Sequence, residues 1–433
     1  MGRELFGTDG VRGVAGQYPL DDATIGQVGL AIAQQFGKSG APILIGRDPR
    51  QSSPHIAQIL AKAINEGGVD VEVVSVITTP GLAYLTRETN ASAGVMVTAS
   101  HNPYTDNGIK VFTSKGEKLT DEQEASLNLA IGQAQPATQV GQSQTAEKLL
   151  KQYEDFLVAS AGGENLANLS MAVDSANGSA SGLAARVFKH LAIDVISLFD
   201  KPDGININDG CGATNIAALQ TEVLKRKLDG GVALDGDGDR VVLVDAQGRE
   251  FNGDHMLYIL AVTGEQIGVV STIMSNYGLE TALADQGIKL ERTAVGDRYV
   301  MEGLRRTGYK LGGEQSGHII LPELLATGDG LLAAVQTMMA VNASGKSLSQ
   351  WRDQVELLPQ AIVNLKVADK QVIANPKIKK IIEDEAADLA GRGRLLVRPS
   401  GTEPVLRIMA EGQNAKITAQ AIAAKIEQAI KSL

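Results

Sequence analysis

Apolar and polar positions alternate along most of the chain in a repeating strand and helix rhythm. Short continuous apolar runs at residues 42–46 and 71–77 predict buried strands, and helical spacing over residues 55–66 predicts a covering helix between them. The same rhythm returns over residues 170–199 and 268–294. Strands that alternate with helices favour largely parallel sheets, because a parallel pair needs a crossover connection.

The pattern changes after about residue 358, where strand patterns at 361–367, 395–397 and 405–409 precede an amphipathic helix over 415–432. We therefore predict three consecutive α/β domains with largely parallel mixed sheets, plus a small α+β C-terminal domain, around a central cleft. The predicted domains are 1–150, 151–248, 249–357 and 358–433.

Composition narrows the possible partners. The 433 residues carry a formal net charge of −10, which disfavours nucleic acid and anionic membrane surfaces as partners. A single cysteine, Cys211, excludes an internal disulfide framework and suits a reducing compartment. No apolar run is long enough for a bilayer span and no signal peptide is evident, so we expect a cytoplasmic protein.

The most specific motif is Asp235-Gly-Asp237-Gly-Asp239, which lies between the apolar runs 231–234 and 241–244. This order predicts a strand, a tight turn and a second strand, with three carboxylates at the tip. Carboxylates this close repel one another, so a hard divalent cation is the expected neutraliser. A solvated acidic turn is the alternative.

The choice of metal follows from the neighbouring residues. A calcium EF-hand needs Gly at the sixth position and Glu at the twelfth, where this chain has Arg240 and Ala246. Scattered histidines and one cysteine disfavour zinc. Mg²⁺ fits an all-oxygen site that meets phosphates.

A second polar loop, Thr98-Ala-Ser100-His101-Asn-Pro103, ends an apolar strand pattern. Ser100 is a candidate nucleophile, and an ordinary turn serine is the alternative. His101 follows it directly, but neighbours on a strand point in opposite directions, so the order alone does not pair them. Lys110 is a candidate base or phosphate ligand, with a surface lysine as the alternative.

Three further stretches carry candidate binding residues. Residues 398–404 with Arg407 resemble an anion cradle or, equally, an ordinary hairpin turn; the candidates there are Arg398, Ser400, Gly401, Thr402 and Arg407. Arg12 lies in a glycine-rich N-terminal stretch that is suited to the same role or, alternatively, is a flexible turn. Glu314, Ser316 and His318 form a polar group suited to sugar hydroxyls, or to a buried structural turn.

These loops, in this order and spread over the whole chain, resemble the α-D-phosphohexomutase family. Residues 98–103 are similar to its phosphoserine loop, residues 235–240 to its magnesium loop, and residues 398–404 to its phosphate loop. The resemblance implies that Ser100 carries a phosphate and joins Asp235, Asp237 and Asp239 as a Mg²⁺ ligand. The resemblance also implies roles for the other candidates. Lys110 or His101 assists proton removal, and Arg12 and Arg240 offset charge near the phosphoserine. Glu314 and Ser316 bind the sugar ring beside His318, and the phosphate that is not reacting is held by Arg398, Ser400, Gly401, Thr402 and Arg407.

Within the family, residues 6–13 and 313–318 are similar to the bacterial branch that acts on glucosamine phosphates. That likeness implies interconversion of glucosamine 6-phosphate and glucosamine 1-phosphate through glucosamine 1,6-bisphosphate, in the supply of UDP-N-acetylglucosamine for peptidoglycan. Mannose or glucose phosphates as substrates, a non-catalytic sugar-phosphate binder and a metal phosphatase are the alternatives. Relatives suggest a homodimer, which no feature of the sequence demonstrates. The first Ser100 phosphate comes from a kinase, from the bisphosphate or from the protein itself, and the sequence does not decide among these routes.

Overall fold

The computed structural model describes residues 5–7, 10–164, 166–167, 169–400 and 404–432. These residues form two compact units. The first unit is Met1–Met274 with Ile288–Asp353, and the second is Ser275–Gly287 with Gln354–Leu433. Each unit is described below by itself.

The first sheet of the first unit has the strand order β1-β5-β4-β2-β3-β6. Its strands are β1 (Val11–Val14), β2 (Ile43–Arg47), β3 (Val71–Val76), β4 (Ala93–Val97), β5 (Asp106–Thr113) and β6 (Ser143–Thr145). Strands β4, β2, β3 and β6 run parallel, while β5 is antiparallel to both β1 and β4. The apolar run of β4 is buried at every position, which explains its place in the middle of the sheet.

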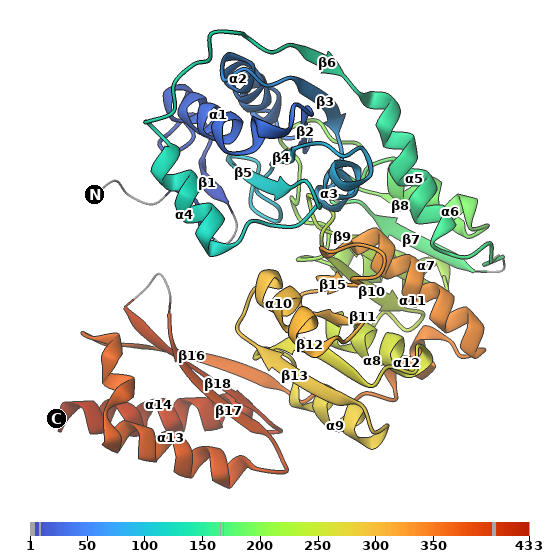
Figure 1. Ribbon diagram of the computed structural model, residues 1–433. Coiled ribbons are helices and arrows are strands. Elements are labelled where there is room, and N and C mark those ends of the chain that lie inside the picture. The colour runs from blue at the N-terminus through green and yellow to red at the C-terminus, as the bar shows by residue number, and fades with distance from the viewer. Residues whose placement is uncertain (1–4, 8–9, 165, 168, 401–403, 433) are drawn as a thin grey trace. The chain divides into compact units, whose positions relative to one another are not determined.

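Helices and short 3₁₀ turns connect these strands, and Figure 1 shows α1 and α2 lying together beside the sheet. They are α1 (Asp22–Phe36), η1 (Gly37–Ser39), α2 (Ser53–Glu66), α3 (Thr79–Glu88), α4 (Asp121–Ala130), η2 (Glu147–Leu149) and α5 (Leu150–Ala159). The buried faces of α1 and α2 share one apolar core with β2 and β4.

The second sheet has the order β11-β10-β9-β7-β8 and carries the acidic motif. Its strands are β7 (Ser170–Asp174), β8 (Asp194–Leu198), β9 (Gly230–Leu234), β10 (Val241–Asp245) and β11 (Glu250–Phe251), with helices α6 (Leu183–His190) and α7 (Ala217–Arg226). Strand β7 is parallel to β8 and β9, and β9 pairs with β10 as an antiparallel hairpin. The predicted strand, turn and strand around the three aspartates is therefore the β9–β10 hairpin.

The third sheet has the order β13-β12-β14-β15. Its strands are β12 (Gly268–Thr272), β13 (Lys289–Thr293), β14 (Gly312–Gly313) and β15 (Ile319–Ile320), with helices α8 (Gly253–Thr263), α10 (Asp297–Thr307), α11 (Gly330–Ser344) and α12 (Leu348–Arg352). Strand β12 is parallel to β13 and β14, and β14 turns back antiparallel into β15. The short β14–β15 connection carries Glu314 and Ser316.

The second unit is built on an antiparallel sheet of order β16-β18-β17. Its elements are α9 (Tyr277–Asp285), β16 (Gln360–Lys366), η3 (Lys370–Ala374), α13 (Pro376–Leu389), β17 (Arg394–Pro399), β18 (Val405–Glu411) and α14 (Ala415–Lys431). Helices α13 and α14 bury Ile378, Ile422 and Ile426 against Leu406 and Ile408 of the central strand. Figure 1 shows both helices beside this sheet.

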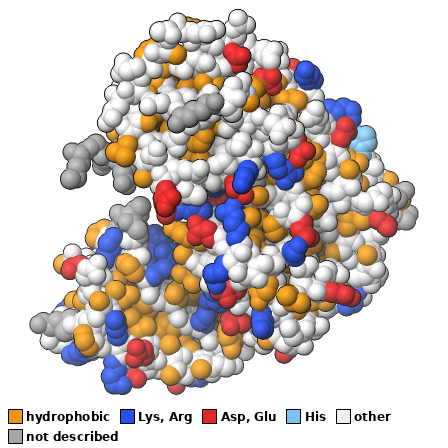
Figure 2. Space-filling model, in the orientation of Figure 1, with side chains coloured by type: hydrophobic (Ala, Val, Ile, Leu, Met, Phe, Trp, Pro, Cys, Tyr) orange, Lys and Arg blue, Asp and Glu red, His pale blue; other side chains and the backbone are white. Residues whose placement is uncertain are grey.

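The predicted fold class is confirmed: three α/β sheets precede a C-terminal α+β region with an antiparallel sheet. The four domain boundaries and the shared central cleft stay predictions. Charged side chains of both signs are scattered over the face seen in Figure 2. Among the helices of the described residues, none combines the length and apolar character needed to cross a membrane.

Candidate active site

The three aspartates of the β9–β10 turn converge. Asp235, Asp237 and Asp239 are buried, and each offers a carboxylate oxygen within 4.8 Å of the others. Gly238 adopts a φ of 73°, in the left-handed region that favours glycine, which lets the turn close this tightly. The hairpin therefore presents three carboxylates to one point.

Ser100 reaches this cluster from another sheet. It follows β4 with a φ of 51°, and its Oγ donates a hydrogen bond to Asp235 Oδ2 at 2.6 Å. In an extended strand, the side chains of Ser100 and His101 would point to opposite faces. The left-handed backbone at Ser100 ends that alternation, so the His101 ring lies on the same side, with its Nδ1 3.4 Å from Ser100 Oγ. The structure thus brings together neighbours that an extended strand would have separated.

Lys110 lies on β5, opposite Met96 of β4. Its Nζ is 2.7 Å from Asp237 Oδ2 and 3.5 Å from Asp239 Oδ2. Burial opposes its charge, but Asp237 and Asp239 more than offset this, so the pKa of Lys110 is raised. Lys110 is therefore an ammonium that partly neutralises the acidic turn.

Lys110 and Arg240, which lies 3.9 Å from Asp239, do not balance three buried carboxylates. Burial, Asp239 and Asp237 together raise the pKa of Asp235 well above its ordinary value. Burial also opposes ionisation of Asp237, but Lys110 outweighs it and lowers the pKa of that carboxyl. Among the described residues, nothing donates a hydrogen bond to Asp237 Oδ1 or Asp239 Oδ1, although both atoms are buried. Unpaired buried carboxylate oxygens fit a hard divalent cation such as Mg²⁺.

Two arginines, Arg240 and Arg12, act on the His101 ring beside Ser100. Arg240 approaches the His101 ring at 3.4 Å, and its backbone N–H donates to Asp235 at 3.2 Å. Burial lowers the pKa of His101, and the charges of Arg240 and Arg12 lower it further. An anionic group on Ser100 would therefore meet two guanidiniums and a neutral imidazole.

The β14–β15 loop comes from the third sheet to the same place. Gly317 accepts a backbone hydrogen bond from Val241 at 3.1 Å, and His318 Nδ1 lies 3.8 Å from Asp239 Oδ2. Glu314 is half-buried and accepts a hydrogen bond from Gly296 at 3.1 Å, while Ser316 is exposed. Glu314 and Ser316 are thus reachable by a ligand, and His318 is buried behind them.

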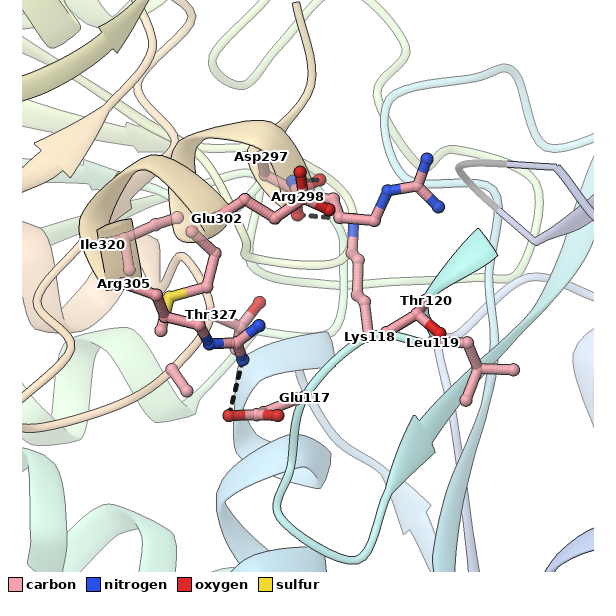
Figure 3. Close-up of a pocket in the computed structure, with 12 residues that line it drawn as sticks. Glu117, Lys118, Leu119, Thr120, Asp297, Arg298, Glu302, Arg305, Ile320 and Thr327 are labelled. Atoms are coloured by element: carbon pink, nitrogen blue, oxygen red, sulfur yellow. Dashed lines mark hydrogen bonds and ion pairs between the residues drawn. The ribbon is translucent and has the colours of Figure 1, made fainter. Parts of the chain in front are cut away.

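Charged pairs anchor this loop region to the first sheet. Asp297 at the start of α10 lies 2.5 Å from Lys118 and 3.3 Å from His318. Figure 3 shows the Lys118 side chain reaching toward Asp297 and Arg305 pointing to Glu117, with which it pairs at 2.7 Å, around a small cavity. The cavity measures ≈ 30 Å³, room for a water molecule but not for a hexose. These pairs position the loop rather than bind a sugar.

The anion-cradle candidates lie in the second unit. Arg398 and Arg407 face each other across β17 and β18, and burial and then Arg407 lower the pKa of Arg398. Ser400 follows β17, and its carbonyl accepts a hydrogen bond from Lys370 at 2.8 Å. Gly401 and Thr402 lie outside the described residues. Two opposed guanidiniums are suited to an anion.

Thr79 and Asn208 orient the site, and sequence reasoning missed both. Thr79 Oγ1 donates to Asp237 Oδ2 at 2.6 Å, and Asn208 Nδ2 donates to the Ser100 carbonyl at 2.9 Å. Thr79 follows a parallel strand, a position that α/β folds use for ligand contacts, so this signal was available. Asn208 lies in an irregular loop that carries no pattern.

Comparison with known proteins agrees with this architecture. Models of the phosphoglucomutase/phosphomannomutase α/β/α domains I, II and III match residues 3–137, 150–248 and 252–358, and the C-terminal domain model matches residues 362–429. The chain belongs to the phosphoglucomutase/phosphomannomutase family.

Proteins that are similar to this chain over nearly its whole length include phosphoglucosamine mutases. That of Thermus thermophilus is 42% identical over 100% of this chain and 98% of its own, and that of Pelotomaculum thermopropionicum is 45% identical over 95% of each. A crystal structure of a phosphoglucomutase/phosphomannomutase family protein from Burkholderia thailandensis superposes with a TM-score of 0.82, at 24% identity over 99% of this chain and 97% of that one. Aspergillus fumigatus N-acetylphosphoglucosamine mutase in complex with GlcNAc-6P and magnesium has a TM-score of 0.70, at 18% identity over 99% and 95%. These two structures show the shared fold.

Proposed function

We propose that this protein is a phosphoglucosamine mutase, which interconverts glucosamine 6-phosphate and glucosamine 1-phosphate. The observation that carries the proposal is the 2.6 Å hydrogen bond from Ser100 Oγ to Asp235, within a cluster of three buried carboxylates. The phosphoglucosamine mutases that match this chain over nearly its whole length support the choice of sugar.

The donor set fits Mg²⁺, because three carboxylates converge and two of their buried oxygens have no donor among the described residues. Asp235, Asp237, Asp239 and Ser100 would hold the ion. When bound, it would supply positive charge to the phosphoryl oxygens during transfer.

Ser100 is proposed to carry the phosphoryl group. The O–P bond at Ser100 breaks as a sugar hydroxyl oxygen forms its own bond to phosphorus, which yields glucosamine 1,6-bisphosphate. The bisphosphate then reorients in the site. The phosphoryl group it carried from the start is transferred to Ser100, and the sugar oxygen that loses it takes up a proton to become a hydroxyl. Arg12 and Arg240 offset the charge of the group in transit.

Two residues are proposed to take the hydroxyl proton, and both stay candidates. His101 lies 3.4 Å from Ser100 Oγ and its pKa is lowered by burial, so its ring is neutral and able to accept a proton. Lys110 is held as an ammonium by Asp237 in the absence of a metal ion. Lys110→Met and His101→Ala, compared by kcat, separate the two roles.

Substrate binding is assigned to two groups of residues. Glu314 and Ser316 are proposed to bind ring hydroxyls in either orientation, with His318 holding the loop behind them. Arg398, Ser400, Gly401, Thr402 and Arg407 are proposed to hold the distal phosphate, and Lys370 adds a cation to that loop.

Mutase turnover on glucosamine 6-phosphate, with Mg²⁺ and the 1,6-bisphosphate, tests the proposal. Wild type should turn over and carry one phosphate by intact mass, whereas Ser100→Ala should do neither. Ser181→Ala, a serine of the second sheet region outside the cluster, serves as the matched control and should behave as wild type. Turnover only on mannose or glucose phosphates would contradict the sugar assignment, and no turnover with phosphate still on Ser100 would favour a binding protein.

The cytoplasmic location, a homodimer and an activating kinase stay predictions. Phosphoryl transfer from the bisphosphate is the simplest alternative to a kinase, since the proposed reaction already places that compound at Ser100. Intact mass of protein incubated with the bisphosphate alone distinguishes the two routes.

A further inference from the structure

A buried ion pair lies directly behind the loop that carries Ser100. Asp48 and Arg50 follow β2, both side chains are fully buried, and Arg50 Nε donates to Asp48 Oδ2 at 2.7 Å. The mechanism proposed above uses neither residue. A fully buried arginine is uncommon, because desolvating a guanidinium has to be offset by its contacts.

The two Nη atoms of Arg50 donate only to backbone carbonyls of the Ser100 loop. Nη2 donates to the carbonyls of Ser100 at 2.8 Å and Asn102 at 2.9 Å. Nη1 donates to the carbonyl of Asp106 at 3.0 Å and to that of Pro103. The planar fork of one guanidinium therefore holds four carbonyls around a single turn of chain.

Asp48 reaches the other side of the Ser100 backbone through Thr98. Asp48 Oδ2 accepts a hydrogen bond from Thr98 Oγ1 at 2.7 Å, and Thr98 Oγ1 accepts one from the Ser100 N–H at 3.0 Å. Since the Thr98 hydroxyl hydrogen points to Asp48, its lone pairs face Ser100. Asp48 therefore fixes the N–H of Ser100 through Thr98, and Arg50 fixes its C=O directly.

This control matters because the Ser100 backbone is strained and tightly fitted. Its φ of 51° lies in the left-handed region, which residues other than glycine rarely adopt. A Cβ at Gly236 would lie 2.6 Å from the Ser100 carbonyl oxygen, so the serine peptide abuts the acidic turn without spare room. A relaxed backbone would move Oγ away from Asp235.

We propose that the Asp48–Arg50 pair is a positioning element that holds Ser100 in its left-handed conformation and so aims Oγ at the acidic turn. The inference rests on the proposed function. Phosphoryl transfer depends on placement of the reacting group, so loss of this hold lowers kcat more than it weakens substrate binding.

Arg50→Lys tests the inference, because it keeps the charge beside Asp48 but offers one nitrogen in place of the fork. The expected result is a fall in kcat of about 10²-fold with little change in KM. Phosphorylation of Ser100 by the bisphosphate, followed by intact mass, should slow by a similar factor. Hydrogen–deuterium exchange of the segment 97–108 should accelerate.

The matched control is Arg249→Lys. Arg249 also pairs with an aspartate and a carbonyl, donating to Asp245 Oδ2 at 2.8 Å and to Ser349 O at 3.3 Å. None of its contacts among the described residues leads to the Ser100 loop. This variant should keep the wild-type kcat and the wild-type exchange of segment 97–108.

Thr98→Val and Thr98→Ser provide a second test that does not depend on Arg50→Lys folding. Valine matches the shape of threonine but removes the acceptor for the Ser100 N–H, whereas serine keeps it. Thr98→Val should therefore lose kcat and gain exchange in segment 97–108, and Thr98→Ser should recover both.

Wild-type kcat and exchange in both Arg50→Lys and Thr98→Val would overturn the inference, as would an equal loss of kcat in Arg249→Lys. The proposed function fails separately, if wild type shows no mutase turnover. In that case the exchange of segment 97–108 in the four variants still decides whether the pair holds Ser100.

Discussion

Two buried charge clusters both contact Ser100, one at its carbonyl and one at its Oγ, and they are built on opposite principles. In the Asp48–Arg50 cluster every nitrogen of the guanidinium donates to an acceptor of the protein itself, so the cluster is complete. In the Asp235–Asp237–Asp239 cluster three carboxylates outnumber Lys110 and Arg240, and two of their oxygens have no hydrogen-bond donor among the described residues. A complete cluster stabilises the fold, whereas an incomplete one is ready for a ligand.

The largest effect is expected from breaking the complete cluster. Asp48→Ala leaves the Arg50 charge buried without its partner, which should lower the free energy of unfolding by about 3–5 kcal/mol. Urea unfolding measures this. Asp155→Ala, which removes half of an exposed pair with Lys151, is the control and should leave the free energy of unfolding nearly unchanged. Equal effects of the two variants would contradict the comparison.

Removing one carboxylate from the incomplete cluster should stabilise the metal-free protein, whereas breaking the complete cluster destabilises it. Asp235→Asn deletes the carboxyl whose pKa burial and its neighbours raise, so the metal-free protein should unfold at a higher temperature than wild type. Mutase activity should fall by about 10²–10³-fold, because the variant weakens the hold on charge that forms during transfer. A destabilised variant that keeps full activity would show that the cluster is structural.

A third buried acidic site, Asp329, sharpens the comparison, because hydrogen bonds rather than an ion pair hold it among the described residues. It caps α11 at Leu332 and accepts from Tyr153 at 2.8 Å, while burial raises its pKa to about 6. A raised folded pKa stabilises the fold below the unfolded value of 3.8, and this stabilisation is lost as pH rises through about 6.

Asp329→Asn keeps the shape and cannot ionise. The free energy of unfolding of wild type, relative to that of this variant, should fall by about 3 kcal/mol between a pH below 3.8 and pH 8. About half of this fall should occur between pH 5 and pH 8. Unfolding midpoints of both proteins across that range measure the difference. A difference that stays constant with pH would show that Asp329 does not titrate there.

Metal addition should give the smallest of these effects. Mg²⁺ at about 100 times its dissociation constant should stabilise wild type by about 2.7 kcal/mol, and a chelator should reverse this. Asp235→Asn should respond less, and Asp155→Ala as wild type does. The same stabilisation in Asp235→Asn would place the ion elsewhere.

Much of the fold follows from local pattern. The β9–β10 hairpin is visible in two apolar runs around a glycine-rich acidic turn, and the buried strand β4 is visible as a continuous apolar run. The opposed Arg398 and Arg407 follow from a short hairpin once its two strands are recognised. These features depend on contacts between residues close in sequence, where periodicity and turn chemistry act.

Other features depend on packing between distant segments. The left-handed φ of Ser100 brings His101 back beside it, against the alternation of a strand, and it is held by Arg50 and Asn208 from separate loops. Lys110 faces Asp237 across 127 residues of sequence. Local propensity carries no information about such pairs, because their energy arises only when the sheets meet.

The sequence by itself determined which chemical groups the site contains: three carboxylates on one tight turn, a serine after a buried strand and a lysine on the next strand. Only the tertiary structure decided that Ser100 Oγ points at Asp235, that Lys110 neutralises part of the acidic turn, and that Asp48 and Arg50 are complete without a ligand. The physical reason is that backbone conformation is set by neighbours along the chain, whereas the balance of buried charge is set by whatever packs around it.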